Sequence, residues 1–393
     1  MGRAGRVLVA CTRDRPPNQP VPELAGYVER RGLAELGPLA VRHGVVGCLW
    51  TALRTAGLAD RPGTAELRAA HSATVAGHLR ALADLRLVDR ALTAAGVGYL
   101  VLKGPVLAGA VYRRPDLRSY VDVDVLVAPA EFAAALAALE SAGCAVFERN
   151  WQLARDRLLG ELRLFTPSGL VLDLHWHVIA DRSIRAAFRL DLAAVRGRAR
   201  TVRLAGRDVR TLDPADTVVH LALHAALAGG HRLIWLKDLE QALLAPDAPQ
   251  WTELVRRAAE WRAGPATALM LARASRTLGV PVPASVLRRL VPDRRWRMVG
   301  RLADVVSPVS RGAGSARPSV GRIVARAARA DGPASRHELA RRTAGWVGTA
   351  ITGGRHDRDR DRLFDPDDNE SAAFPSGGPT GRAAYLDEVS LSG

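Results

Sequence analysis

Two aspartates stand two positions apart in a segment that alternates valine with other residues. The segment is VDVDVLV, residues 121–127, and its alternation predicts a β-strand whose side chains point to opposite faces in turn. Asp122 and Asp124 would then share one face, while the valines, beginning with Val121, would face the core. Adjacent carboxylates repel each other, and a divalent cation such as Mg²⁺ offsets that charge because it prefers oxygen ligands. The pair therefore indicates a metal site, with a solvated strand face as the alternative.

A third carboxylate follows in the segment VLDLHWH, residues 171–177. By the same alternation, Asp173, His175 and His177 share one face, and the apolar residues between them face the core. If this strand lies beside the first, Asp173 completes a triad of carboxylates that can hold two Mg²⁺ or Mn²⁺ ions about 3.5–4 Å apart. The alternative is that Asp173 lies at a strand edge near arginine side chains. His175 and His177 are candidate cleft residues.

One lysine stands out because the chain uses arginine almost everywhere else. Of its 56 basic residues, only Lys103 and Lys237 are lysines. Lys103 and Gly104 follow a short apolar strand predicted at 97–102, and the next residue, Pro105, can open a helix. The exposed N–H groups of a first helical turn favour an anion, glycine lets a phosphate approach the backbone, and lysine supplies a flexible point charge. Lys237, in the segment WLKDLE, is interpreted as a helix-surface residue.

Other polar residues are weaker candidates. Arg118, four residues before Asp122, is a second candidate phosphate contact, with a solvated loop arginine as the alternative. His220 and His224 are spaced i, i+4 on a predicted helix, which can suit zinc. Histidine pairs on helices are more often core or cleft residues, and that interpretation is favoured here.

The hydrophobic period divides the chain into five parts. Apolar residues at helical spacing dominate on either side of a central stretch in which short β-prone runs alternate with helices. This pattern predicts the α/β (α+β) class, with a small mixed sheet flanked by N- and C-terminal helical regions. The parts are a loose leader (1–22), an N-terminal helical region (23–95), an α/β core (96–205), a C-terminal helical region (206–305), and a mostly disordered tail (306–393) with a short helix near 320–345.

Composition narrows the function classes. The net charge of +16 suits a polyanionic partner such as a nucleotide or nucleic acid, although arginine used as a general surface residue would give the same charge. Three widely spaced cysteines without a CxxC motif argue against a disulfide framework and a structural zinc site, and fit a reducing cytoplasm. No apolar run approaches the length of a membrane span, so no membrane partner is expected.

These residues together resemble the nucleotidyltransferase superfamily with the DNA polymerase β-like fold. More closely, the chain is similar to a branch of uncharacterised bacterial nucleotidyltransferases over roughly residues 25–290. The resemblance is carried by LAVRHGVVGCLW (39–50), YLVLKGPVLAGAVY (99–112), LRSYVDVDVLV (117–127), LDLHWHV (172–178) and HLALHAALAGGHRLIWLKDLEQAL (220–243). The block from LKG to DVDVLV is the specific part, and the helical flanks are less specific.

The resemblance implies roles for individual residues. Asp122 and Asp124 would bind the metal, and Asp173 would be the third carboxylate and a candidate base. Lys103 and Gly104 occupy the place where the wider superfamily carries a Gly-Ser phosphate motif, so the missing serine departs from the superfamily although not from this branch.

The predicted function is a metal-dependent nucleotidyltransferase. It would move an NMP group from an NTP such as ATP to a hydroxyl or phosphate of an unknown acceptor, which could be a small molecule, a peptide, a protein or RNA. Two rivals are a non-catalytic nucleotide- or nucleic-acid-binding protein on the same fold and a DxD glycosyltransferase. The first would bind nucleic acid in a salt-sensitive way without Asp122 and Asp124, and the second would need a nucleotide-sugar pocket before the DxD.

Overall fold

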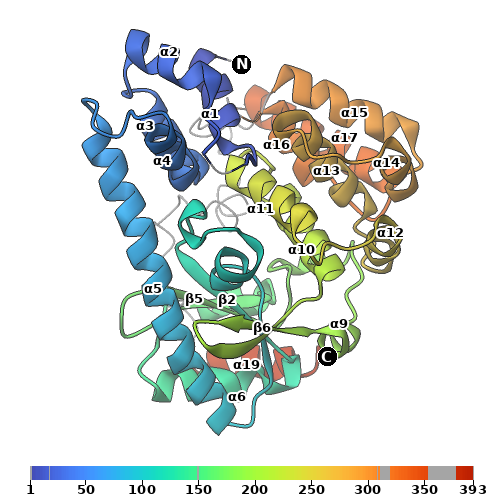
Figure 1. Ribbon diagram of the computed structural model, residues 1–393. Coiled ribbons are helices and arrows are strands. Elements are labelled where there is room, and N and C mark those ends of the chain that lie inside the picture. The colour runs from blue at the N-terminus through green and yellow to red at the C-terminus, as the bar shows by residue number, and fades with distance from the viewer. Residues whose placement is uncertain are drawn as a thin grey trace. The chain divides into compact units, whose positions relative to one another are not determined.

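A computed structural model describes residues 2–16, 18–147, 150–307, 309, 319–352 and 378–392 (Figure 1). The side chains of 346–352 and of 378–379 lie outside this description. The chain divides into two units, each assembled from separate segments. A helical unit takes residues 1–75, 114–119 and 214–365, and a sheet unit takes residues 76–113, 120–213 and 366–393. The longest helix, α5 (Thr64–Ala94), contributes residues to both.

The sheet unit is built on one mixed sheet of seven strands in the order β3-β4-β5-β2-β1-β7-β6. Strand β2 pairs in parallel with β5, and β1 pairs in parallel with β7, while the remaining pairs are antiparallel. This mixed sheet flanked by helices confirms the predicted α/β class. The strands are β1 (Tyr99–Val101), β2 (Asp122–Val127), β3 (Ala145–Val146), β4 (Glu161–Phe165), β5 (Val171–His175), β6 (Arg200–Leu204) and β7 (Arg207–Thr211).

Alternation along the central strands separates an apolar face from a polar face, as predicted. The apolar face carries Val123 and Val125 of β2 and Leu172 and Leu174 of β5, all at most 2% exposed. Val121 does not share their burial. It precedes β2 and is 72% exposed, so the expected row of core valines begins at Val123 instead.

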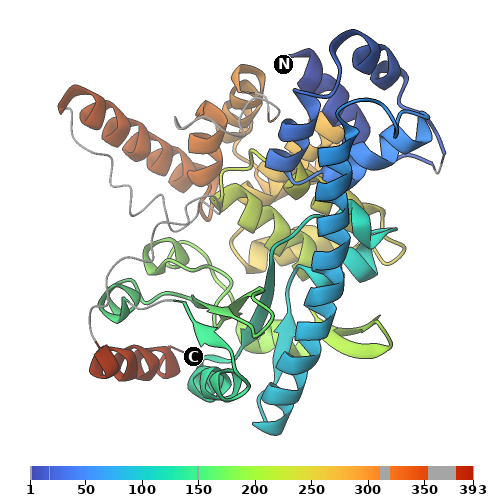
Figure 2. The same cartoon turned by 90° about the vertical axis from the view of Figure 1, so that its left-hand side faces the viewer.

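Short helices complete the sheet unit. They are η1 (Leu107–Val111), η3 (Pro129–Glu131), α6 (Phe132–Ser141), α7 (Trp151–Asp156), α8 (Arg182–Arg185), α9 (Leu192–Arg198) and α19 (Gly378–Ser390). Helix α19 packs against α6 and α7, and both views show it beside α6 (Figures 1 and 2). Its Tyr385 is fully buried, with the ring edge-on to Phe132 at 6.3 Å between centroids.

The helical unit joins the two helical regions that the sequence separated. Its elements are α1 (Arg3–Thr12), α2 (Pro22–Arg31), α3 (Leu36–His43), α4 (Val46–Thr55), η2 (Pro115–Leu117), α10 (Pro214–Leu227), α11 (Leu233–Leu244), α12 (Trp251–Glu260), α13 (Gly264–Leu278), α14 (Ala284–Leu290), α15 (Arg294–Val306), α16 (Val320–Arg326) and α17 (Gly332–Thr352). Helix α1 packs against α11 and α13, so the first and last parts of this unit share one core.

Both ends of the chain carry more structure than the sequence suggested. Residues 3–12 of the expected loose leader form α1, because its apolar side chains, among them Leu8 at 0% exposure, are buried in the helical unit. In the expected tail, α16 and α17 fall near the predicted short helix at 320–345, and α19 adds a helix that was not foreseen. Residues 310–318 and 353–377 of that tail lie outside the described residues.

Candidate active site

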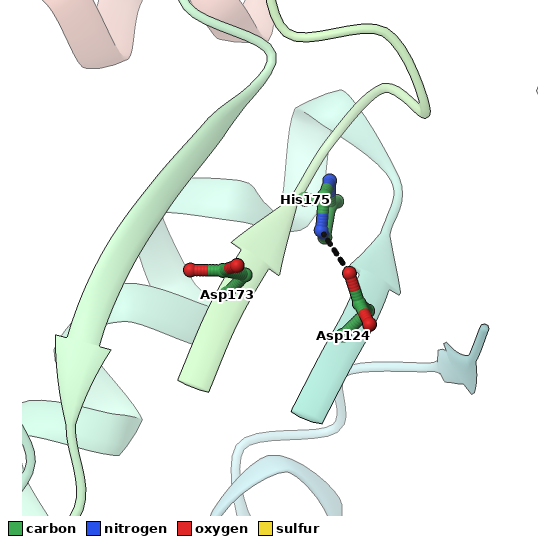
Figure 3. A group of neighbouring side chains, drawn as sticks. All are labelled: Asp124, Asp173 and His175. Atoms are coloured by element: carbon green, nitrogen blue, oxygen red, sulfur yellow. Dashed lines mark hydrogen bonds and ion pairs between the residues drawn. The ribbon is translucent and has the colours of Figure 1, made fainter. Parts of the chain in front are cut away.

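Two of the predicted carboxylates face each other across neighbouring strands. In the parallel pairing of β2 with β5, Asp124 stands opposite Asp173, and both belong to the polar face of the sheet. Figure 3 shows the two side chains with His175 beside them. Asp124 is 1% exposed and Asp173 is 6% exposed. The half-buried Asp122 lies on the same face of β2, one pleat before Asp124.

Lys103 reaches this pair from the turn after β1. Its Nζ atom lies 2.8 Å from Oδ1 of Asp124. The turn is fixed from both sides, because the backbone N–H of Leu102 donates to the backbone oxygen of Asp124 and because Gly104 adopts a left-handed φ of +52°. A helical segment begins at Pro105, as predicted, and continues as the π-helix η1. The sequence LKGP thus places an ammonium beside a strand carboxylate.

His175 lies between two carboxylates. Its Nε2 atom is 3.2 Å from Oδ1 of Asp124, and its Nδ1 atom is 3.0 Å from Oε2 of Glu161. Glu161 belongs to β4, where the antiparallel register places it opposite His175. In the same register Arg163 stands opposite Asp173, with Nε 3.2 Å from Oδ1. Glu161 and Arg163 were not among the predicted site residues.

The charges in this cluster shift one another's protonation. Burial alone would raise the pKa of the Asp124 carboxyl, but Lys103 and His175 outweigh burial and hold that pKa well below its usual range. Burial would lower the pKa of Lys103, but the neighbouring carboxylates, chiefly Asp124, raise it instead. The two side chains therefore form a charged pair at neutral pH.

The pKa of Asp173 shifts in the opposite direction to that of Asp124. Burial, followed by the charges of Glu161 and Asp122, raises the pKa of its carboxyl to about 7, despite the opposing effect of Arg163. Burial lowers the pKa of His175, but Glu161 and Asp124 raise it to about 10. Two carboxyl groups on adjacent strands thus differ in protonation, a division that is common where acid–base chemistry takes place.

The donor set fits a divalent cation. Asp124, Asp173 and His175 each offer a ligand atom, and these atoms lie within 4.8 Å of one another. The Oδ2 atom of Asp124 is buried and has no hydrogen-bond partner among the described residues. A buried, unpartnered carboxylate oxygen is costly unless something else binds it. His175 lies next to the predicted ligands because its ring follows Asp173 by one pleat on the same face, and it would have to lose its proton to bind a metal ion itself.

Two further predicted residues have partners of their own. Arg118 belongs to the helical unit, where its buried guanidinium pairs with Asp238, with Nε and Nη2 at 2.8 and 3.1 Å from the two carboxylate oxygens. Its role as a phosphate contact stays a prediction. His177 is half-buried, its Nδ1 accepts a hydrogen bond from the backbone N–H of Ile179, and burial lowers its pKa to about 3.

The interpretation of Lys237 as a helix-surface residue was wrong. It is 3% exposed, and its Nζ atom lies 2.7 Å from Oε2 of Glu240, one turn later on α11. The i, i+3 pair is buried because α1 and α13 pack on α11. His220 is also buried, and the described residues contain no group of potential metal ligands around it, so the core interpretation of the His220–His224 pair is favoured.

A comparison with known families gives this geometry a chemical context. A sequence model of a family described as uncharacterised nucleotidyltransferase matches residues 31–279. The chain belongs to this nucleotidyltransferase family. It is accordingly an enzyme of that kind, as the resemblance in the sequence indicated. The matched region includes all residues of the group described above, which we call the Asp124 cluster: Lys103, Asp122, Asp124, Glu161, Arg163, Asp173 and His175. No curated protein and no solved structure matches the chain.

Part of the chain lies outside the matched region. Helices α16, α17 and α19 all lie beyond residue 279, outside the matched region. Among the described helices, none is long and apolar enough to cross a membrane.

Proposed function

We propose that this nucleotidyltransferase uses the Asp124 cluster to move an NMP group from an NTP to a hydroxyl or phosphate of an acceptor, with release of pyrophosphate. The observation that carries the proposal is the placement of Asp124 opposite Asp173 on parallel strands, with a buried, unpartnered oxygen on Asp124 and the ammonium of Lys103 at 2.8 Å. Carboxylates that converge beside an ammonium group suit a triphosphate held through a divalent ion.

Asp122, Asp124 and Asp173 would hold the divalent ion, which we propose to be Mg²⁺ or Mn²⁺, while His175 positions Asp124. When bound, such an ion neutralises phosphate charge and makes an acceptor hydroxyl easier to deprotonate. The chain supplies positioning, since β2 and β5 fix the carboxylates and the Lys103–Gly104 turn brings a positive charge and backbone N–H groups to the same place. We assign Lys103 and Gly104 to the phosphates of the donor.

Proton transfer is assigned to Asp173. Without metal its carboxyl has a pKa of about 7, and a bound divalent ion would lower that pKa, so an ionised Asp173 can accept the proton of an acceptor hydroxyl as the new oxygen–phosphorus bond forms and the bond to pyrophosphate breaks. Asp124 stays ionised under the same conditions because of Lys103 and His175.

The charge of the chain bears on the class of acceptor. The net charge of +16 favours an anionic partner, so an RNA or another polyanion is one acceptor class, beside small molecules and proteins. The three free, buried cysteines suit action in a reducing cytoplasm.

Isothermal titration tests the proposal. Each of the four NTPs is titrated into the protein with and without Mg²⁺, and the series is repeated on an Asp122→Asn/Asp124→Asn variant. Asparagine is chosen because Asp124 is buried and an isosteric side chain preserves the packing. The exposed Asp156 of α7, as Asp156→Asn, is the control. We expect metal-dependent binding of at least one NTP that only the double variant loses. Equal binding by the double variant would contradict the proposal and favour a non-catalytic binding protein.

A further inference from the structure

The carboxylates of the candidate site are already paired with basic side chains of the chain itself. Asp124 contacts Lys103 at 2.8 Å and His175 at 3.2 Å, and Asp173 contacts Arg163 at 3.2 Å. These contacts are to Oδ1 of each aspartate, so an entering divalent cation can take the unpartnered Oδ2 of Asp124 only where it stands close to these positive groups. Two cations cannot share one carboxylate at contact distance without repelling each other.

Of the two partners of Asp124, Lys103 is better placed to leave than His175. Its ammonium ends a flexible four-carbon stem, whereas the His175 ring is held from two sides by Asp124 and Glu161. The backbone under Lys103 is fixed, because Gly104 packs against the carbonyl oxygen of Asp122. A change in the lysine can thus be confined to its side chain, which can turn from Asp124 without moving the turn.

We propose that Lys103 is a placeholder cation, which neutralises Asp124 while the site lacks a divalent ion and is released toward the phosphates of the donor when metal and nucleotide enter together. This inference rests on the proposed function. It makes metal binding and phosphate binding mutually dependent, because metal alone displaces a favourable ion pair, while metal with a triphosphate gives the displaced ammonium a new anionic partner. The site then discriminates against free metal ions.

The second lysine provides a matched control. Lys237 is also buried and ion-paired, but its partner Glu240 belongs to the helical unit and takes no part in the candidate metal site. Because the chain holds only these two lysines, isotope-labelled lysine gives an NMR spectrum with two side-chain ammonium signals. Lys237→Met assigns them by removing one.

The experiment measures Mg²⁺ binding by calorimetry and the two ammonium signals by NMR, with Mg²⁺ alone and with Mg²⁺ plus inorganic tripolyphosphate. We expect the Lys103 signal to shift when Mg²⁺ and tripolyphosphate are added together. With Mg²⁺ alone it should shift only at concentrations that saturate the site, and the Lys237 signal should stay in place under all conditions. Lys103→Met should bind Mg²⁺ alone about tenfold more tightly than the native protein, because an opposite charge at this distance is worth one pKa unit or more. It should lose the gain that tripolyphosphate gives the native protein.

A charge-preserving variant guards against loss of structure. Lys103→Arg keeps a cation beside Asp124, so it should bind Mg²⁺ alone no more tightly than the native protein, and Lys237→Met should match the native protein. The placeholder role of Lys103 is overturned if Mg²⁺ binds but leaves the Lys103 signal unmoved, or if Lys103→Met binds Mg²⁺ no more tightly than the native protein. The metal site of the proposed function stands in either case. If neither the native protein nor Lys103→Met binds Mg²⁺, both are overturned.

Discussion

Gly104 lies so close to Asp122 that no side chain fits between them. A Cβ atom on Gly104 would stand 2.9 Å from the backbone oxygen of Asp122, and the residue has a φ of +52°. Two separate constraints, a left-handed backbone and a close approach, thus demand glycine at the point where the chain turns from Lys103 toward the helix. This contact fixes the lysine relative to the strand that bears the carboxylates.

Gly104→Ala is therefore expected to impair both stability and activity. The strained φ and the clash together should cost about 2 kcal/mol of unfolding free energy, and the displaced turn should lower kcat/KM by on the order of a hundredfold. Gly96→Ala is the matched control, since Gly96 also has a positive φ, of +68°, but no described atom lies within 4 Å of its added Cβ. Denaturant unfolding and steady-state kinetics measure both effects. Equal losses in the two variants would show that the contact with Asp122 is unimportant.

Two aspartates on one strand should respond differently to the same substitution. Asp124→Asn removes the carboxylate 2.8 Å from the buried ammonium of Lys103, so we expect a loss of roughly 3 kcal/mol in unfolding free energy without metal. Asp122→Asn removes a half-buried charge that raises the pKa of Asp173, so its cost should stay below about 1 kcal/mol. Both should lower turnover by on the order of a thousandfold. Urea unfolding in chelator and turnover with Mg²⁺ test the pair, and wild-type turnover in either variant would contradict the assigned metal site.

The helix α19 should stabilise the sheet unit from outside the matched family region. Tyr385 donates from its hydroxyl to the backbone oxygen of Leu159 at 2.7 Å, an oxygen that also accepts from Nε1 of Trp176. Tyr385→Phe should cost about 1 kcal/mol, and Tyr385→Ala roughly 3–5 kcal/mol through the lost packing. Leu391→Ala, at a position 85% exposed, is the control and should change little. Thermal unfolding ranks the three variants by stability. If Tyr385→Ala were as stable as the native protein, α19 would not dock in solution.

Acid should weaken the helical unit through His231. Burial, followed by the charges of Arg322 and Arg326, lowers the pKa of this histidine to about 3. A histidine with a depressed folded-state pKa stabilises the protein above its unfolded pKa near 6.5, and that contribution is lost as pH falls toward 3. His231→Gln should therefore lose less stability than the native protein between pH 7 and pH 5, by about 2 kcal/mol.

The exposed His337 of α17 provides the control for this measurement. His337→Gln should keep the pH dependence of the native protein. Thermal unfolding at pH 7, 6 and 5 compares the three proteins, and parallel curves for all of them would contradict the assignment to His231.

Local patterns account for the parts of the site that could be predicted from the sequence. Alternation in VDVDVLV and VLDLHWH depends only on the pleat, so it identified which side chains of β2 and β5 share a face, and the structure brings Asp124, Asp173 and His175 together on it. The change from β-prone residues to Pro105 located the Lys103 turn, because this signal too lies within a few neighbouring residues. The catalytic roles of these residues stay predictions.

The features that were missed depend on contacts between distant segments. Glu161 meets His175 only because β4 pairs with β5 in one particular register, and a shift of one residue would have turned its side chain to the other face. The first four residues of ELRLF alternate between charged and apolar types, which was the available signal in the sequence. Lys237 is buried beside Glu240, which in turn accepts a hydrogen bond from the backbone N–H of Asp14, 226 residues earlier. No local window could show that contact.

The docking of α19 has a consequence for how the chain is made. Tyr385 follows Leu159, its hydrogen-bond acceptor, by 226 residues, a length that a ribosome translates in roughly 10 to 45 seconds. In the later part of that interval, after β7 ends at Thr211, the nascent sheet unit has all seven strands but lacks the helix whose Tyr385 contacts Trp151 and Trp176. A temporarily uncovered tryptophan surface is a target for chaperones, so the yield of native enzyme should depend on protection during synthesis more than its final stability would suggest.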